Sequence, residues 1–386
     1  MSEYQLITDT ATLETYVDTI RNADFVTVDT EFMRESTYYP QLCLIQLSDG
    51  ENHAAVDPLA DGIELDSLLD LLVEDDVLKV MHAAGQDVEI FYHLTGTTPD
   101  PLFDTQIAAM ALGMGEQLGY AGLVQQMLNV TLDKGARFTD WARRPLDKRQ
   151  LDYAIADVTH LAELFPKMLD ELKRLDRGAW LNADMQKLTN PETYANDPEK
   201  SWMRVKFQGR NAEALGRLKA LAAWREREAQ EKDLPRGRIV KDETLADLAG
   251  HPPKEQVGLA RIRGLSKTWA QNDIGGRLMD AIDSAKPMSA TEMPEKPRGR
   301  PRLGADSALI ADLLKLLLKV RSKEANVAAK LIGRAEDLER LAAGERDGVP
   351  LLEGWRYEVF GKDALALVEG RLSFAVKDGR MVMSDV

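Results

Sequence analysis

Residues 25–32 read FVTVDTEF, a short apolar run that leads directly into two acidic residues, Asp29 and Glu31. The apolar run predicts a buried strand with both acids at its end. Side chains two residues apart on a strand point to the same face, so the two carboxylates should lie together. Buried like charges repel each other unless a cation lies between them, and Mg²⁺ prefers oxygen ligands. The alternative for an isolated pair is a strand that has ended, with its acids facing water.

Strand and helix patterns alternate around this stretch. The first expected helix has apolar residues at helical spacing and Thr10 as its cap, and the turn Ser48-Asp49-Gly50 joins two expected strands into a hairpin. Strands that alternate with helices predict a mixed α/β sheet covered by helices, and the pattern from about 105 to 190 is helical. Further strands are expected at residues 42–47, 53–56, 78–81 and 102–103, and helices at residues 13–20, 65–73 and 88–94.

The 386-residue chain divides into three blocks, which agrees with its length. Residues 1–190 form the α/β block, residues 204–286 a compact helical bundle, and residues 305–386 a second helical block of similar length. A polar connector that begins at Asn190 separates the first two blocks. A linker at residues 287–304, rich in proline and basic residues, separates the last two.

The net charge of −15 is distributed unevenly along the chain. Residues 1–190 hold 14 basic and 33 acidic residues, a net of −19, whereas residues 191–386 hold 35 and 31, a net of +4. A carboxylate site beside a separate binding surface would have this distribution, and so would an acidic surface that only keeps the protein soluble. The single cysteine, Cys43, excludes an intramolecular disulfide and fits a reducing, cytoplasmic location. No signal peptide or membrane span is expected.

Two further acidic motifs follow in the α/β block. HAAGQD, which ends at Asp87, follows an expected strand, so this carboxylate lies in the first turn of a helix, where the helix dipole favours it. YAIAD places Tyr153 and Asp157 one turn apart on one helix face. Each motif alone has a structural explanation that is more common. Together with the first acidic pair they supply four carboxylates and a phenol, enough to hold two metal ions for displacement at phosphorus.

With these motifs the chain resembles the DEDD exonucleases, named for four acids, in the subgroup with a tyrosine one turn before the last acid. Three segments narrow the resemblance to the ribonuclease D family: VDTEFMRESTYYPQLCLIQL, HAAGQDVEIF and WARRPLDKRQLDYAIADVTHLAELF. This match covers about residues 1–185. Residues 204–286 are similar to the helicase-and-RNase-D C-terminal (HRDC) domain, and residues 204–296 hold 18 basic and 14 acidic residues, a net of +4. Residues 305–386 lie where the family carries a second, diverged HRDC-like bundle.

The resemblance implies a ribonuclease H-like, mixed-sheet exonuclease domain followed by two all-α helical bundles. It implies a 3′–5′ exoribonuclease that trims structured RNA precursors, tRNA among them, and releases nucleoside 5′-monophosphates. Two Mg²⁺ ions per site are expected, with Mn²⁺ or another divalent metal as a substitute. The expected partner is RNA, bound by a monomer away from any membrane.

The resemblance also implies roles for the motif residues. Asp29, Glu31 and Asp157 would hold the first metal ion. Asp29 would bridge to the second, which Asp87 would support directly or through water. Tyr153 would orient the attacking water.

Five more residues are candidates for substrate contacts. Phe32 could stack on the terminal base, with a place in the core as an equal alternative. Gln86 and Gln150 could contact sugar or phosphate. Arg144 could contact a phosphate or be a solvated charge, and His82 lies beside the second motif either as a substrate contact or as a structural hydrogen-bonding residue.

Two other functions are compatible with this scaffold. A DNA-directed 3′–5′ exonuclease would share its fold and metal chemistry, although the tract from Trp141 to Gln150, typical of ribonuclease D, favours RNA. A noncatalytic RNA-binding protein would carry an inert nuclease domain, whereas all four acids and the tyrosine are present here.

Overall fold

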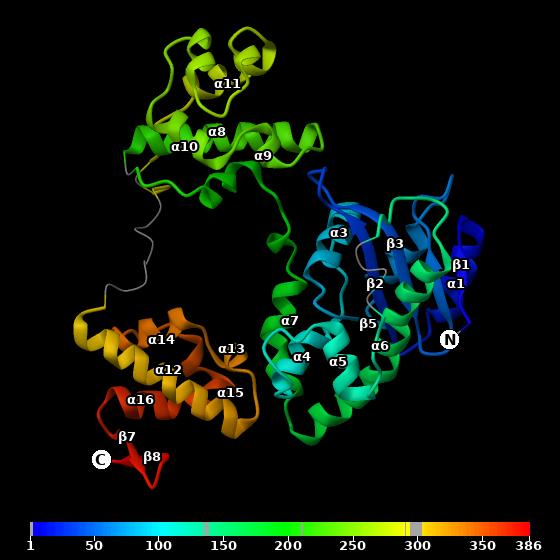
Figure 1. The fold of residues 1–386 in the computed structure, drawn as a ribbon, viewed down its shortest axis with the longest axis vertical. Coiled ribbons are helices and arrows are strands. Elements are labelled where there is room, and N and C mark those ends of the chain that lie inside the picture. The colour runs from blue at the N-terminus through cyan, green and yellow to red at the C-terminus, as the bar shows by residue number, and fades with distance from the viewer. Residues whose placement is uncertain (1–2, 134, 136–138, 210, 290, 294–302) are drawn as a thin grey trace.

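The computed structural model of the chain describes residues 3–133, 135, 139–209, 211–289, 291–293 and 303–386. Figure 1 shows an α/β block and two helical blocks, one around α8 and one around α12. Most of the linker expected at residues 287–304, including its basic run, lies outside the described residues. Among the residues that are described, no helix is long and apolar enough to cross a membrane.

A six-stranded mixed sheet forms the centre of the first block. Its strand order is β1-β4-β3-β2-β5-β6, in which β3 runs antiparallel to both of its neighbours and all other pairs are parallel. The predicted hairpin is therefore present as β3 and β4. The strands are β1 (Gln5–Ile7), β2 (Phe25–Met33), β3 (Gln41–Ser48), β4 (His53–Val56), β5 (Leu78–Met81) and β6 (Leu102–Asp104).

The sheet differs from the sequence prediction at two places. β1 was not predicted, because only three residues pair with β4 and its burial pattern shows no alternation. The acids do not follow the end of β2 but lie within it, because β3 pairs with β2 as far as Met33. A bulge between Glu31 and Phe32 interrupts this pairing and shifts its register.

Helices cover the sheet and continue beyond it. The apolar face expected for the first helix is buried in α1, but Asp9 is its cap, one residue before the expected Thr10. The region from 105 to 190 is not continuously helical, because no helix occurs among the described residues between Leu128 and Lys148. The helices are α1 (Thr10–Ile20), α2 (Asp66–Leu71), α3 (Gly85–Thr95), α4 (Thr105–Ala111), α5 (Tyr120–Leu128), α6 (Lys148–Arg174), η1 (Gly178–Leu181) and α7 (Asn182–Leu188).

The second block is a helical bundle built around α8. Its core includes Leu218, Leu221 and Leu245, and Tyr38 from the loop between β2 and β3 inserts into the same core. The Tyr38 ring lies under the guanidinium of Arg236, at 4.7 Å from ring centroid to Cζ. The elements are η2 (Pro191–Thr193), η3 (Pro198–Arg204), α8 (Ala212–Glu231), α9 (Arg236–Ile239), α10 (Asp242–Gly250), η4 (Gln256–Arg261), η5 (Lys267–Ala270) and α11 (Asp273–Asp283).

The third block is helical except at its end, where β7 and β8 form an antiparallel hairpin that was not predicted. The hairpin is mostly exposed and therefore carries no clear alternation of apolar and polar residues. The elements are α12 (Ala305–Ala325), α13 (Ala329–Ile332), α14 (Ala335–Ala342), η6 (Pro350–Leu352), α15 (Gly354–Arg356), η7 (Tyr357–Gly361), α16 (Lys362–Val368), β7 (Leu372–Lys377) and β8 (Arg380–Asp385).

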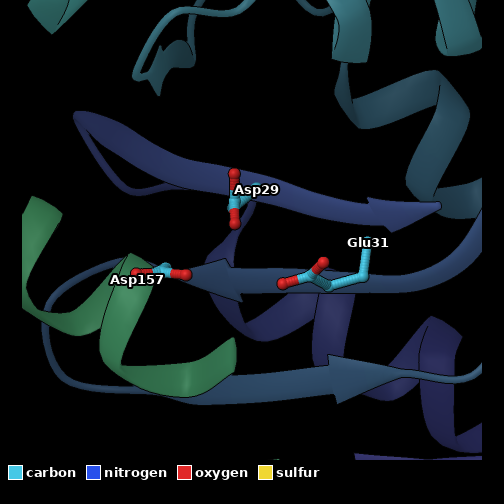
Figure 2. A group of neighbouring side chains, drawn as sticks. All are labelled: Asp29, Glu31 and Asp157. Carbon is cyan, nitrogen blue, oxygen red and sulfur yellow. The ribbon is translucent and has the colours of Figure 1, made fainter. Parts of the chain in front are cut away.

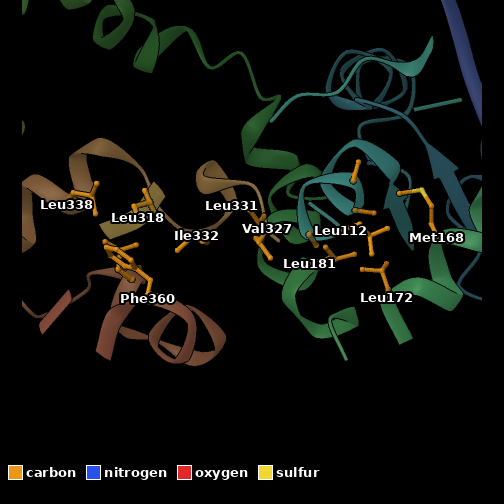
Figure 3. Close-up of a cluster of buried hydrophobic side chains, with 14 of the residues drawn as sticks. Leu112, Met168, Leu172, Leu181, Leu318, Val327, Leu331, Ile332, Leu338 and Phe360 are labelled. Atoms are coloured by element: carbon orange, nitrogen blue, oxygen red, sulfur yellow. The ribbon is translucent and has the colours of Figure 1, made fainter. Parts of the chain in front are cut away.

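One hydrophobic cluster extends from the α/β block into the third block. Figure 3 shows Leu112, Leu172 and Leu181 on one side and Leu331 and Phe360 on the other, all members of this cluster. The rings of two tryptophans from the two blocks, residues 180 and 355, stack with centroids 4.2 Å apart. The two blocks are therefore packed together by buried apolar surface, although the sequence suggests separate units.

Candidate active site

Strand β2 and helix α6 together position three acidic side chains. Asp29 and Glu31 lie two residues apart on β2 and so point to the same face of the sheet. Helix α6 packs across β2, β3 and β4 and brings Asp157 to that face. The nearest carboxylate oxygens of the three residues all lie within 4.8 Å of one another. Figure 2 shows the three carboxylates facing the space between the strand and the helix.

The fourth acid approaches from helix α3. Asp87 lies in the first turn of α3 and is buried, with 8% of its surface exposed. It lines the same cavity as the other three acids but is not part of their close group. The hydroxyl of Thr30, which stands between the two acids of β2, donates a hydrogen bond to the Asp87 carboxylate.

The electrostatics of the acids show the cost of placing like charges together. Burial, followed by the charges of Asp157, Asp87 and Glu31, raises the pKa of Asp29 well above its usual value. Burial also raises the pKa of Asp87 to about 6, although the hydrogen bond from Thr30 acts in the opposite direction. A bound cation would offset both the repulsion and the loss of solvation. The donor set consists of hard carboxylate oxygens, so it fits a divalent ion such as Mg²⁺.

A cavity of about 650 Å³ opens beside the acids and gives room for a substrate. Tyr153, one helical turn before Asp157 on α6, lines this cavity together with Phe32, Gln86 and His82. Phe32 also packs against the buried cluster between α1 and the sheet, so it borders both the cavity and the core. His82 has its Nδ1 atom 3.0 Å from the hydroxyl of Thr105.

Two expected substrate contacts lie elsewhere. The guanidinium of Arg144 forms two hydrogen bonds of 2.7 Å with the Asp57 carboxylate and donates to the main-chain carbonyl of Cys43. The Gln150 side chain accepts from the Asp147 amide as half of the capping box that starts α6. Neither residue lines the cavity, and both are engaged in holding the protein together. The role of these two residues as substrate contacts stays a prediction, beside the contacts within the protein that the structure shows.

Several cavity residues were missed from the sequence, among them Gln106, Leu132 and the segment from Gly119 to Gly122. This segment is the start of α5, and Tyr120 is its first helical residue. A glycine before an apolar run is a local sign of a helix start. No local pattern, however, indicates that this helix start faces Asp29, about ninety positions earlier in the chain.

Comparisons with known proteins identify the family. A family model described as 3′-5′ exonuclease matches residues 4–173, and the HRDC domain model matches residues 214–282. A ribonuclease D from Sphingobium indicum is 61% identical over 100% of this chain and 99% of its own length. A ribonuclease D from Zymomonas mobilis is 57% identical with the same coverage of both chains.

A solved structure agrees with these relatives. The crystal structure of Escherichia coli RNase D, described as an exoribonuclease involved in structured RNA processing, superposes with a TM-score of 0.79. The two chains are 30% identical, and the similarity covers 95% of this chain and 99% of that one. The cluster of acids, the full-length relatives and the shared fold agree with one another, and the chain belongs to the ribonuclease D family of metal-dependent 3′–5′ exoribonucleases.

Proposed function

We propose that the chain hydrolyses RNA one nucleotide at a time from the 3′ end with two divalent cations, releases nucleoside 5′-monophosphates, and trims structured precursors such as those of tRNA. The observation that carries this proposal is the group of three carboxylates within 4.8 Å beside a cavity that a fourth carboxylate also lines. Four carboxylates are enough to hold two metal ions for displacement at phosphorus. The substrate class follows the Escherichia coli protein, which is described as acting in structured RNA processing.

Different acids would bind the two cations. Asp29, Glu31 and Asp157 would hold the first, and Asp29 would reach the second together with Asp87. When bound, the cations supply a water of lowered pKa and neutralise the charge that develops on the phosphate. We expect Mg²⁺ to be the physiological ion, with Mn²⁺ as a substitute, in a monomer that works in the cytoplasm.

Four other cavity residues would act on the substrate or the attacking water. The Tyr153 phenol lies one turn from Asp157 on the same helix and would orient the attacking water by a hydrogen bond. Phe32 presents its ring to the cavity and would stack on the terminal base, a contact that tolerates every base. Gln86 and His82 line the cavity as well and would contact the sugar or phosphate.

The test of the metal site is a set of conservative substitutions assayed on a short single-stranded RNA. Asp29→Asn and Asp157→Asn should lower kcat/KM by more than about 100-fold, because the loss of a direct ligand exceeds the 10–100-fold loss typical of outer partners. Tyr153→Phe should bind RNA and Mn²⁺ normally but turn over slowly, because only the water-holding hydroxyl is lost. A chelator should abolish activity, and added Mg²⁺ should restore it.

The control substitution is Asp152→Asn, which lies on the same helix as Asp157 but pairs with Lys148. This variant should retain normal activity. Near-normal hydrolysis by Asp29→Asn would refute the proposed metal site. A matched DNA oligonucleotide tests the alternative function, that of a DNA-directed exonuclease. Equal rates of hydrolysis on RNA and DNA would contradict the assignment to RNA.

A further inference from the structure

Three consecutive carbonyl groups of helix α6 accept hydrogen bonds from side-chain hydroxyls of other elements. Tyr120, the first residue of α5, donates to the main-chain oxygen of Ala156 at 3.2 Å and of Asp157 at 2.5 Å. Thr27 of β2 lies with its hydroxyl 3.0 Å from the main-chain oxygen of Val158. These carbonyls belong to the turn that carries the Asp157 carboxylate toward β2.

In the middle of a helix each carbonyl already accepts the amide four residues later, so these contacts are additional to the hydrogen bonds of the helix itself. Asp157 stands ten residues into the 27-residue helix α6, far from either end, so these carbonyls need no capping partner. The Leu161 amide, which is the helical partner of the Asp157 carbonyl, also faces the Tyr120 hydroxyl and acts to lower its pKa. The Tyr120 hydroxyl therefore lies beside the main-chain hydrogen bonds of α6 at Asp157, the residue of this helix that belongs to the acidic site.

The two hydroxyls approach this turn from different elements. Thr27 is fully buried in β2, two residues before Asp29, and its hydroxyl also lies 3.0 Å from the Ser48 carbonyl of β3. Tyr120 approaches from α5, where its ring lines the cavity and meets the His82 ring edge-on with centroids 5.5 Å apart. The Tyr120 hydroxyl donates to the main chain of the turn, so it acts there as a donor.

We propose that Tyr120 and Thr27 are positioning residues that clamp the α6 turn against the sheet and so hold Asp157 at the distance from Asp29 and Glu31 that a shared cation needs. The proposal rests on the metal site proposed above. Three like-charged carboxylates repel one another, so the turn that carries one of them tends to move away when no cation is bound. Two hydroxyl bonds to the main chain oppose that motion without adding a further charge to the site.

Tyr120→Phe and Thr27→Val remove one hydroxyl each and keep the shape of the side chain. We expect kcat on a short RNA to fall about tenfold with little change in KM, because a misplaced metal ligand affects the chemical step and not the binding of RNA. Mn²⁺ binding, measured by calorimetry without RNA, should weaken severalfold. Hydrogen exchange of the α6 peptide that contains Leu161 should become faster in the metal-free protein.

The matched control is Tyr16→Phe. Tyr16 is a buried tyrosine that also donates to two main-chain carbonyls, those of Leu47 at 3.2 Å and Asn52 at 3.1 Å, but it lies away from the cavity. Its loss should lower stability by a similar amount and leave kcat and Mn²⁺ affinity unchanged. If Tyr120→Phe and Thr27→Val match Tyr16→Phe in kcat, Mn²⁺ affinity and α6 exchange, the clamp is only part of the core and the inference is wrong.

Two variants keep the test decisive. If Tyr120→Phe does not fold, Thr27→Val alone must show the loss of Mn²⁺ affinity, and wild-type affinity in that variant overturns the proposal. Asp157→Asn separates this inference from the proposed function. If Asp157→Asn itself binds Mn²⁺ and cleaves RNA normally, the metal site is wrong, whereas an inactive Asp157→Asn beside a normal Tyr120→Phe rejects only the clamp.

Discussion

Asp87 illustrates at the residue scale how the site stores unfavourable charge. Its pKa rises from 3.8 to about 6, chiefly through burial, so the folded protein favours the neutral carboxyl more than the unfolded chain does. The stability that this preference contributes is fully present below the unfolded pKa of 3.8 and is lost as the pH rises through about 6. A metal-free protein at neutral pH therefore holds an ionised, buried carboxylate that destabilises the fold.

The corresponding prediction concerns stability against pH in the presence of a chelator. The free energy of unfolding of the wild type should fall relative to Asp87→Asn by about 2 kcal/mol between pH 4 and 7, from a shift of about two pKa units. Chemical denaturation at several pH values measures this difference, with Asp152→Asn as the control. Added Mg²⁺ should reverse the loss in the wild type, because a cation stabilises the ionised form. Parallel pH curves for the wild type and Asp87→Asn would contradict this account.

At the scale of elements, Arg177 joins the ends of two helices from different blocks. Its guanidinium donates to the carbonyl of Ala111 at the end of α4, at 2.6 Å. It also donates to the carbonyls of Ala325 at 2.5 Å and Asn326 at 3.0 Å, at the end of α12. The last carbonyls of a helix have no partner within it and carry partial negative charge, so a buried cation satisfies both ends at once.

We predict that Arg177→Gln lowers the free energy of unfolding by about 2 kcal/mol, because hydrogen bonds from a charged donor to buried carbonyls are lost. Limited proteolysis should then cut between α12 and α13, where the chain leaves the helix end. Arg174→Gln is the control, since Arg174 lies three residues earlier, is exposed, and pairs only locally with Glu171. Equal unfolding midpoints for the two variants would show that Arg177 does not hold the blocks together.

At the scale of the whole molecule, the distribution of charge and the packing of the blocks have different consequences. The charge separates an acidic catalytic half, at −19, from a remainder at +4, which favours a detachable nuclease with a separate RNA-binding part. The hydrophobic cluster in Figure 3 instead continues from α6 of the α/β block into α12 and the rest of the third block. A cut after residue 195 would expose Leu112 and Leu181 to water, so truncation would test folding as much as RNA binding.

Charge substitutions on the intact chain avoid this problem. Replacing the exposed Arg261, Arg263 and Lys267 of the HRDC-like bundle by Gln should raise KM for a tRNA precursor and leave kcat on a short single strand unchanged. The slope of log affinity against log salt should flatten by about 2, since each lost contact contributes about 0.7 for a single strand.

The matched control removes three charges from α12 instead, at Lys315, Lys319 and Lys323. Equal losses of RNA affinity in the two triple variants would mean that RNA responds only to total charge. A salt slope that stays at the wild-type value in the HRDC-like variant would show that this bundle does not hold RNA.

Much of the architecture could be predicted because the relevant information is local. The apolar run at Phe25 to Val28, the hairpin around Ser48-Asp49-Gly50 and the face of α1 are patterns within a few residues, and each appears in the structure. The spacing of Asp29 and Glu31 within one strand, and of Tyr153 and Asp157 within one helix, is also local. The sequence therefore determined which side chains share a face, but not what each face meets.

What each face meets was decided only by tertiary structure. Arg144 belongs to a tract typical of ribonuclease D, yet its partner is Asp57, 87 residues earlier. Tyr120 reaches the carbonyl of Asp157, 37 residues later, and Thr27 reaches that of Val158, 131 residues later. Such pairs have no periodicity in the sequence, because they form only where helix α6 packs across the sheet. That position depends on the packing of the whole core.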